Sequence, residues 1–148
     1  NLGRNNIMIG YFLKSGDNLR DNEIFAEFLR EYNYSFVEDI KKRKYGADLD
    51  LVLIQYHVSG KFSPWEQIRP RILNYSSKQK AISVIVGVKI EDFISLSDQQ
   101  KKQFFVDTTR QAVLDVRARL EKKKLDVDFD KLLKDLDEIN KKYLESDQ

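Results

Sequence analysis

Two apolar runs rich in β-branched residues constrain the fold of this chain most strongly. Residues 47–60 read ADLDLVLIQYHVSG and residues 81–90 read AISVIVGVKI. Both have the length and the residue preferences of strands. Residues 7–13 are apolar at alternating positions on both faces, which predicts a third strand buried on both sides. Residues 71–75 follow Pro70, which cannot sit in a central strand, so they predict an edge strand.

Loop and helix signals fill the rest of the chain. Residues 76–80 (SSKQK) predict a hairpin loop that pairs 71–75 with 81–90 in antiparallel fashion. A first helix is expected to be capped by Asp21 or Asn22 and to end near Asn33. Residues 34–46 fit either a short strand or a helical turn. Two further helices are expected over about 98–123, opened by a capping box at 97–100 (SDQQ), and from Asp128 or Asp130 to about 143.

The order of these segments predicts the fold class. Strands gather early and helices late, which is typical of an α+β fold. We expect an antiparallel sheet of about four strands, with the N-terminal helix and two C-terminal helices packed on it. The 148 residues suit a single domain over 1–148, with residues 1–6 and 145–148 peripheral. No stretch approaches the roughly 18 apolar residues of a membrane helix.

Catalytic and metal chemistry find little support in the sequence. The chain has no cysteine, which excludes disulfides, thiolate metal sites and a cysteine nucleophile. His57 is the only histidine, and a place within the strand is favoured for it over a role as general base. Asp126, Asp128 and Asp130 have the spacing of a calcium loop, without its glycine and its final glutamate. We therefore predict no catalytic residue, no cofactor and no metal, and a protein that is not an enzyme.

The distribution of charge favours a protein partner. The net charge of +2 argues against a general nucleic-acid binder, although the basic run at 41–44 keeps that alternative open. Residues 21–50 hold eight acidic against five basic residues, interleaved with tyrosines. Acids steer the approach of a basic partner and tyrosines supply contact area, although an ordinary charged helix face would look the same. The candidate binding residues are Glu23, Glu27, Glu31, Tyr32, Tyr34, Glu38, Asp39 and Tyr45.

Several segments between about residues 48 and 140 carry a family resemblance. They are LVLIQYHVSGKF at 51–62, RPR at 69–71, YSSK at 75–78, the strand at 82–88, LSDQQ at 96–100 and FDKLL at 129–133. This pattern resembles the small immunity proteins of bacterial polymorphic toxin systems, including contact-dependent growth inhibition. The resemblance implies a cytoplasmic protein that binds the C-terminal domain of one cognate toxin. It assigns no site residue and leaves the oligomeric state open. Another protein-binding module, a nucleic-acid-binding protein or an enzyme remain the alternatives.

Overall fold

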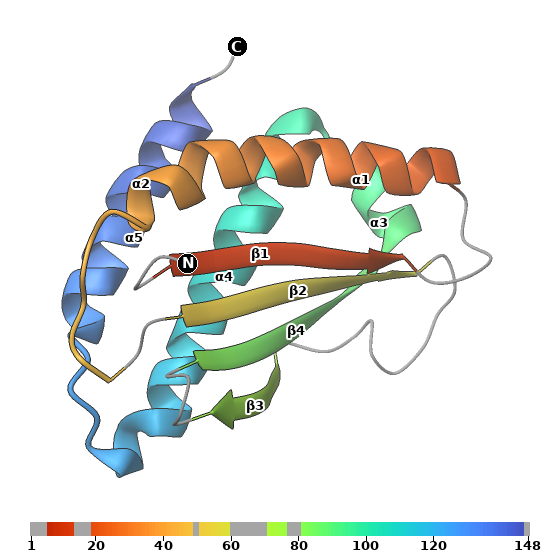
Figure 1. The fold of residues 1–148 in the computed structure, drawn as a ribbon. Helices are drawn as coiled ribbons and strands as arrows, with labels where there is room; N and C mark the ends of the chain where they lie inside the picture. Colours follow the sequence, from red (N-terminus) through yellow and green to blue (C-terminus); the bar gives the residue numbers. More distant parts are fainter. Residues whose placement is uncertain (1–5, 14–18, 49–50, 60–70, 77–80, 147–148) are drawn as a thin grey trace.

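Four strands form one mixed sheet (Figure 1). The computed structural model describes residues 6–13, 19–48, 51–59, 71–76 and 81–146. The strands are β1 (Asn6–Leu13), β2 (Leu51–Ser59), β3 (Arg71–Ser76) and β4 (Ala81–Lys89), in the spatial order β1-β2-β4-β3. The β1–β2 and β2–β4 pairs are parallel, and only β3–β4 is antiparallel.

The expected α+β fold with an antiparallel sheet is therefore wrong. The described chain is mostly helical, and two of the three strand pairs are parallel. The reason lies in the connections, because a parallel pair needs a long crossover that returns the chain to its starting end. The helical segment between β1 and β2 makes such a crossover. Between β2 and β4, the chain first forms β3 at the outer edge, and β4 then pairs with β2 in parallel.

The predicted hairpin is confirmed within this mixed sheet. β3 occupies the edge and pairs with β4 in antiparallel register, with a shift between Ile72 and Asn74. β4 lies between β2 and β3, as its β-branched composition predicts for a central strand. The hairpin loop at 76–80 lies largely outside the described residues, as does the burial of both faces expected for residues 7–13.

The first helical segment is longer than expected. It comprises α1 (Leu19–Tyr32), a π-helical turn η1 (Asn33–Val37) and α2 (Glu38–Ile40). The helix is already formed at Leu19, so Asp21 and Asn22 lie within it and the predicted cap at either residue is wrong. Of the two alternatives for residues 34–46, helical structure is correct up to Ile40, where the buried side chains of Phe36 and Ile40 continue the apolar stripe of α1.

The remaining helices follow β4. They are α3 (Ile90–Ile94), α4 (Asp98–Leu120), a short 3₁₀ turn η3 (Glu121–Lys123) and α5 (Phe129–Glu145). The capping box that opens α4 is confirmed. The Gln100 N–H donates to Ser97 Oγ at 3.2 Å, and the Ser97 N–H donates to Gln100 Oε1 at 2.9 Å. Among the described helices, none combines the length and the apolar character needed to cross a membrane.

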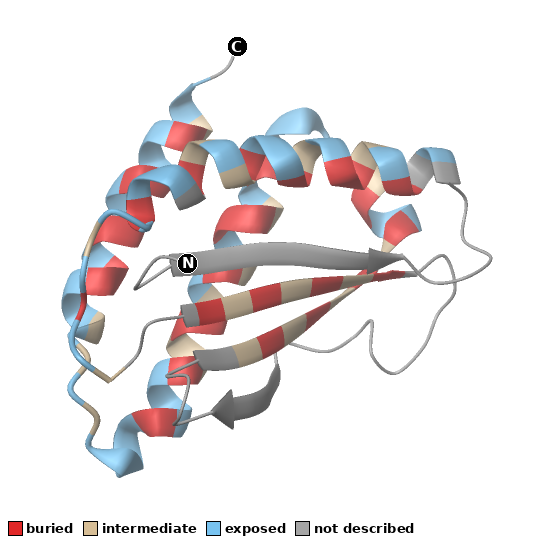
Figure 2. Ribbon diagram, in the orientation of Figure 1, coloured by how far each residue is buried: buried red, intermediate tan, exposed pale blue. Residues whose placement is uncertain are grey.

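The core lies between one face of the sheet and the helices (Figure 1). Along β2 and β4, buried and half-buried side chains alternate, as the banding in Figure 2 shows. The ring of Tyr56 on β2 meets Phe25 of α1 and Phe105 of α4 at centroid distances of 5.6 and 5.5 Å. The opposite face of β2, which carries Leu53, Gln55 and His57, stays half-exposed. The helices thus cover one face of the sheet and present their other sides to solvent.

Candidate functional site

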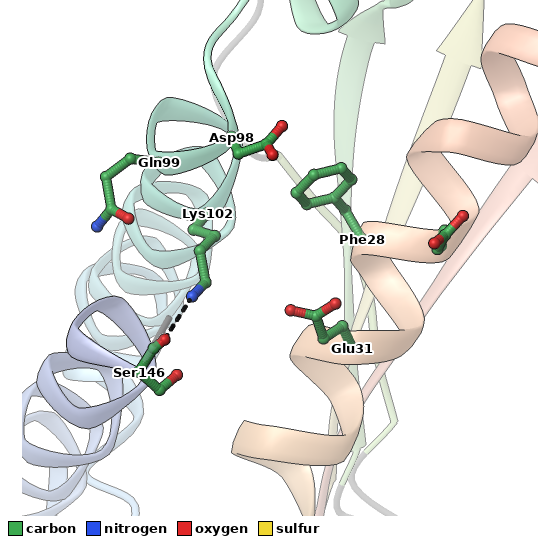
Figure 3. A pocket seen from close by; sticks show the side chains of 7 residues that line it. Phe28, Glu31, Asp98, Gln99, Lys102 and Ser146 are labelled. Atoms are coloured by element: carbon green, nitrogen blue, oxygen red, sulfur yellow. Dashed lines mark hydrogen bonds between the residues drawn. The ribbon is translucent and has the colours of Figure 1, made fainter. Parts of the chain in front are cut away.

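An open groove of about 830 Å³ lies where α1, the start of α4 and the end of α5 meet (Figure 3). It joins segments that are far apart in the sequence. Figure 3 shows Phe28 projecting from α1 towards α4, between Asp98 and Glu31. The groove is lined by Glu27, Phe28 and Glu31 of α1, by Asp98, Gln99 and Lys102 of α4, and by Ser146 after α5.

Helical periodicity places the α1 residues at the groove. Phe25, Leu29 and Tyr32 are buried and fix the inward face of the helix. Residues four apart lie above one another on a helix, so Glu27 and Glu31 share a side that faces solvent. Phe28 lies between the two faces and is half-buried, packed against the core along one side. The groove therefore offers an apolar surface bordered by carboxylates.

Two acids of the groove are free of ion pairs and hydrogen bonds within the described residues, whereas its lysine is engaged by the protein. Within the described residues, no ion pair or hydrogen bond engages the carboxylates of Glu27 and Glu31. Lys102 is buried, and its Nζ donates to the Ser146 carbonyl oxygen at 3.4 Å and lies 4.8 Å from the Tyr143 ring centroid. A cation suits this end of α5, where carbonyl groups lack helical partners. The groove thus keeps negative charge available to solvent.

Lys101, next to the groove, also donates to a backbone carbonyl oxygen and lies against an aromatic ring. Its Nζ donates to the Leu96 carbonyl oxygen at 2.8 Å and lies 3.9 Å from Asp98 Oδ1. It also lies 5.5 Å from the ring centroid of Phe28, so this ring already contacts one cation from the protein side. Both lysines are buried and serve the structure of the helix ends.

Six of the eight candidate binding residues lie on the surface. Glu23, Glu27 and Glu31 are exposed on α1, Tyr34 is exposed on η1, and Glu38 and Asp39 are exposed on α2. They share one continuous helical segment, and two of them, Glu27 and Glu31, line the groove.

The other two candidates, Tyr32 and Tyr45, are buried and cannot present their side chains to a partner in this conformation. Tyr32 is fully buried, and its hydroxyl donates to Asn140 Oδ1 at 3.1 Å. Tyr45 is 5% exposed, and its hydroxyl donates to Asp135 Oδ2 at 2.7 Å. Burial raises the pKa of both phenols above the ordinary value, so they remain neutral hydrogen-bond donors. Tyr32 has the helical spacing of the buried face of α1, and this spacing predicts its position better than its closeness in sequence to the acids does.

The basic run at 41–44 is partly neutralised within the protein. Lys41 pairs with Glu38 at 2.8 Å, and Arg43 pairs with Asp135 Oδ1 at 3.1 Å. Desolvation alone would raise the pKa of Asp135, but hydrogen bonds from Tyr45 and Arg43 outweigh it and hold that pKa below the usual value. Arg43 therefore joins the loop after α2 to α5, and the run is not a uniform cationic patch.

Residues singled out for catalysis or metal binding take other positions. His57 lies half-buried on the sheet face that points away from the helices. Asp128 caps α5, since its Oδ1 accepts a hydrogen bond from the Lys131 N–H at 3.0 Å. Among the residues that the structure describes, no three of His, Asp and Glu gather as metal ligands would.

The sequence did not reveal the groove residues outside the list of candidates. Phe28 has the helical spacing of an apolar core residue, and Asp98 and Gln99 have the pattern of the first turn of a capped helix. No local signal shows that this turn lies beside α1. Lys102 offers a weak signal, because it follows Lys101 near the start of a helix, where cations are unfavourable unless they find other partners.

Comparison with known proteins gives one match. The model of a protein family described as Immunity protein 44 matches residues 11–142, which is most of the chain and includes the strands and helices around the groove. No curated protein matches, and neither does any solved structure.

Proposed function

The chain belongs to the Immunity protein 44 family, and from this membership we propose that it neutralises a cognate toxin by binding it directly. Family membership makes it an immunity protein with a toxin partner. The step to direct binding through a defined surface rests on the groove, which is open, negatively charged and bordered by two carboxylates that have no partner among the described residues.

The proposed binding surface is the exposed side of the segment from α1 to α2, together with the groove. Glu23, Glu27 and Glu31 extend along α1, and Glu38 and Asp39 continue on α2. Phe28 supplies apolar contact area within the acidic border. Such a surface complements a basic patch on a toxin domain, because opposite potentials accelerate encounter and disfavour wrong partners.

We also propose that the protein acts by binding alone and without catalysis, on the C-terminal domain of a polymorphic or contact-dependent inhibition toxin in the cytoplasm. The resemblance described above supports this class of toxin. For His57, the remaining candidate for a general base, we expect that His57→Ala leaves protection of toxin-producing cells unchanged. A loss of protection with retained toxin binding would favour an enzymatic role.

Co-expression with the product of the neighbouring toxin gene tests the proposal. The toxin domain carries an affinity tag and a substitution that removes its activity, and the two proteins are purified together. We expect a stoichiometric complex and, with active toxin, growth only in cells that also make this protein. Recovery of the toxin domain alone, at concentrations where both proteins are folded, would contradict direct binding.

A further inference from the structure

Tyr34 differs from every other large hydrophobic residue whose side chain the structure describes. It is 80% exposed, and no other large hydrophobic residue there is classed as exposed. The other aromatic rings whose side chains the structure describes pack in the core or against it. No described residue makes a hydrogen bond or a ring contact with Tyr34. Its ring therefore adds no hydrogen bond or ring contact that would stabilise the described fold.

The backbone holds this ring outward. Tyr34 lies in the π-helical turn Asn33–Val37, a rare geometry that often occurs at functional sites. Tyr32 and Phe36, two residues before and after it, are fully buried, and their rings stack at 5.2 Å with an interplanar angle of 3°. Because both neighbours are fixed in the core, the backbone of Tyr34 is ordered before any partner binds. Such preorganisation lowers the entropic cost of association.

The surroundings of Tyr34 indicate the chemistry of its partner. Glu31 lies three residues before it and Glu38 four residues after it, both exposed on the same helical segment. Glu38 is paired with Lys41 at 2.8 Å, so Glu31 is the carboxylate of the two that has no ion-pair partner among the described residues. An exposed aromatic ring on the same helical segment as an unpaired carboxylate suits the guanidinium of arginine or the ammonium of lysine, which can contact a ring and an acid together. Tyrosine is also enriched among the residues that dominate the affinity of an interface once a partner covers them.

We propose that Tyr34 is the anchor of the toxin interface and enters a recess on the toxin domain that is rimmed by arginine or lysine. This rests on the proposed function and adds to it a residue that determines affinity. The charged groove of α1 and α4 then governs the rate of encounter, and Tyr34 governs how long the complex lasts.

Association and dissociation rates test this proposal. They are measured with the full chain and with the inactivated toxin domain immobilised on a sensor surface. Tyr34→Ala should weaken binding about 30-fold, mostly through faster dissociation, as truncation of an anchor does. Tyr34→Phe keeps the ring and should stay within about threefold of the unchanged protein. Arg119→Ala, an exposed truncation on α4, is the control and should have no effect.

Thermal unfolding of the same variants separates binding from stability. Tyr34→Ala should leave Tm within about 2 °C, because an exposed ring without packing partners contributes little to the fold. If Tyr34→Ala dissociates at the unchanged rate while Glu27→Lys with Glu31→Lys slows formation of the complex, Tyr34 is not the anchor and the proposed function stands. If the unchanged protein fails to bind the toxin domain, both proposals fall.

Discussion

At the scale of single residues, Gly46 leaves no room for a side chain. Its φ is 135°, a value that residues with a Cβ rarely adopt, and an added Cβ would overlap the backbone carbonyl of Asp126. Gly46 forms an isolated bridge with Val127, which fastens the loop after α2 to the loop before α5. The Ala47 N–H donates to the same Asp126 carbonyl oxygen at 3.0 Å, so the two backbones cannot separate without losing this contact.

Replacement of Gly46 should therefore be costly. We expect Gly46→Ala to lower the free energy of unfolding by about 2 kcal/mol or more, since both backbone strain and steric overlap oppose it. Urea denaturation followed by circular dichroism measures the change. Lys44→Ala, an exposed substitution two residues away, should stay within about 0.5 kcal/mol. Equal stability of the two variants would mean that the loops do not approach each other as closely as described.

Asp135 should make stability depend on pH in the acidic range. Its pKa in the folded protein lies below the usual value, so the stability that it contributes is complete above about pH 4, the pKa of an unfolded aspartate. This contribution is lost as the pH falls through the folded pKa. We expect Asp135→Asn to be less stable than the unchanged protein at pH 7 and to lose less stability between pH 4 and pH 2.

Denaturant titrations across this pH range test the role of Asp135. Asp107→Asn is the matched control, because Asp107 is exposed on α4 and accepts one hydrogen bond from Gln103. Its profile should follow that of the unchanged protein. If Asp135→Asn and Asp107→Asn behave alike, the bonds from Tyr45 and Arg43 do not stabilise the charged carboxylate.

At the scale of helices and strands, the cap of α4 is the clearest local determinant. Ser97 Oγ accepts from the Gln100 N–H, and Gln100 Oε1 accepts from the Ser97 N–H. We expect Ser97→Ala to lower the free energy of unfolding by about 1 kcal/mol, because one backbone donor loses its partner. Ser97→Asp keeps an acceptor and should restore most of this loss. The same denaturation assay measures both, and no difference between alanine and aspartate would show that the cap contributes little.

Local signals predicted elements well and pairings poorly. The strands at 51–59, 71–76 and 81–89 and the capped helix α4 each have a short-range cause in β-branched composition, a proline or a capping box. The parallel pairing of β1 with β2 depends on the path of the chain between them, which no local pattern encodes. The π-helical turn was missed for a related reason. The stripe that continues through Tyr32, Phe36 and Ile40 shows that the helix goes on, but not how tightly it winds.

For the whole molecule, electrostatics should control the rate of association with the toxin. We expect Glu27→Lys, Glu31→Lys and Asp39→Lys together to slow association roughly tenfold or more at low salt, because steering by opposite charge is removed. The unchanged protein should associate more slowly as salt rises, and the triple variant should depend less on salt. Stopped-flow measurements with the inactivated toxin domain give these rates.

A matched control places this effect on the proposed surface. Glu121→Lys, Asp130→Lys and Glu138→Lys reverse the same number of exposed acids on η3 and α5. The two triple variants change the net charge by the same amount. If the surface on α1 and α2 binds the toxin, the variant with reversals there must slow association more than the control variant does. If the two triple variants slow association equally, only net charge matters and the surface on α1 and α2 is wrongly chosen.

The candidate site could be predicted only in part, because its residues come from segments that are far apart in the sequence. Charge and periodicity identified Glu27 and Glu31 because both lie on one helix. Asp98, Gln99 and Ser146 join them through the packing of α1, α4 and α5, which brings together residues that are far apart in the sequence. Proximity to the acids did not reveal that Tyr32 and Tyr45 are buried, because a tyrosine can satisfy its hydroxyl in the core, as Asn140 and Asp135 allow here.

The division of the first helical segment into a buried side and an exposed side bears on how such a protein can change over generations. Phe25, Leu29, Tyr32 and Phe36 maintain the core, while Glu27, Glu31, Tyr34 and Glu38 reach solvent from the same backbone. Substitutions of the solvent-facing residues leave the packing of the buried residues unchanged. A lineage can therefore follow a diverging toxin by altering a few outward positions one at a time, with each intermediate still folded and available to selection.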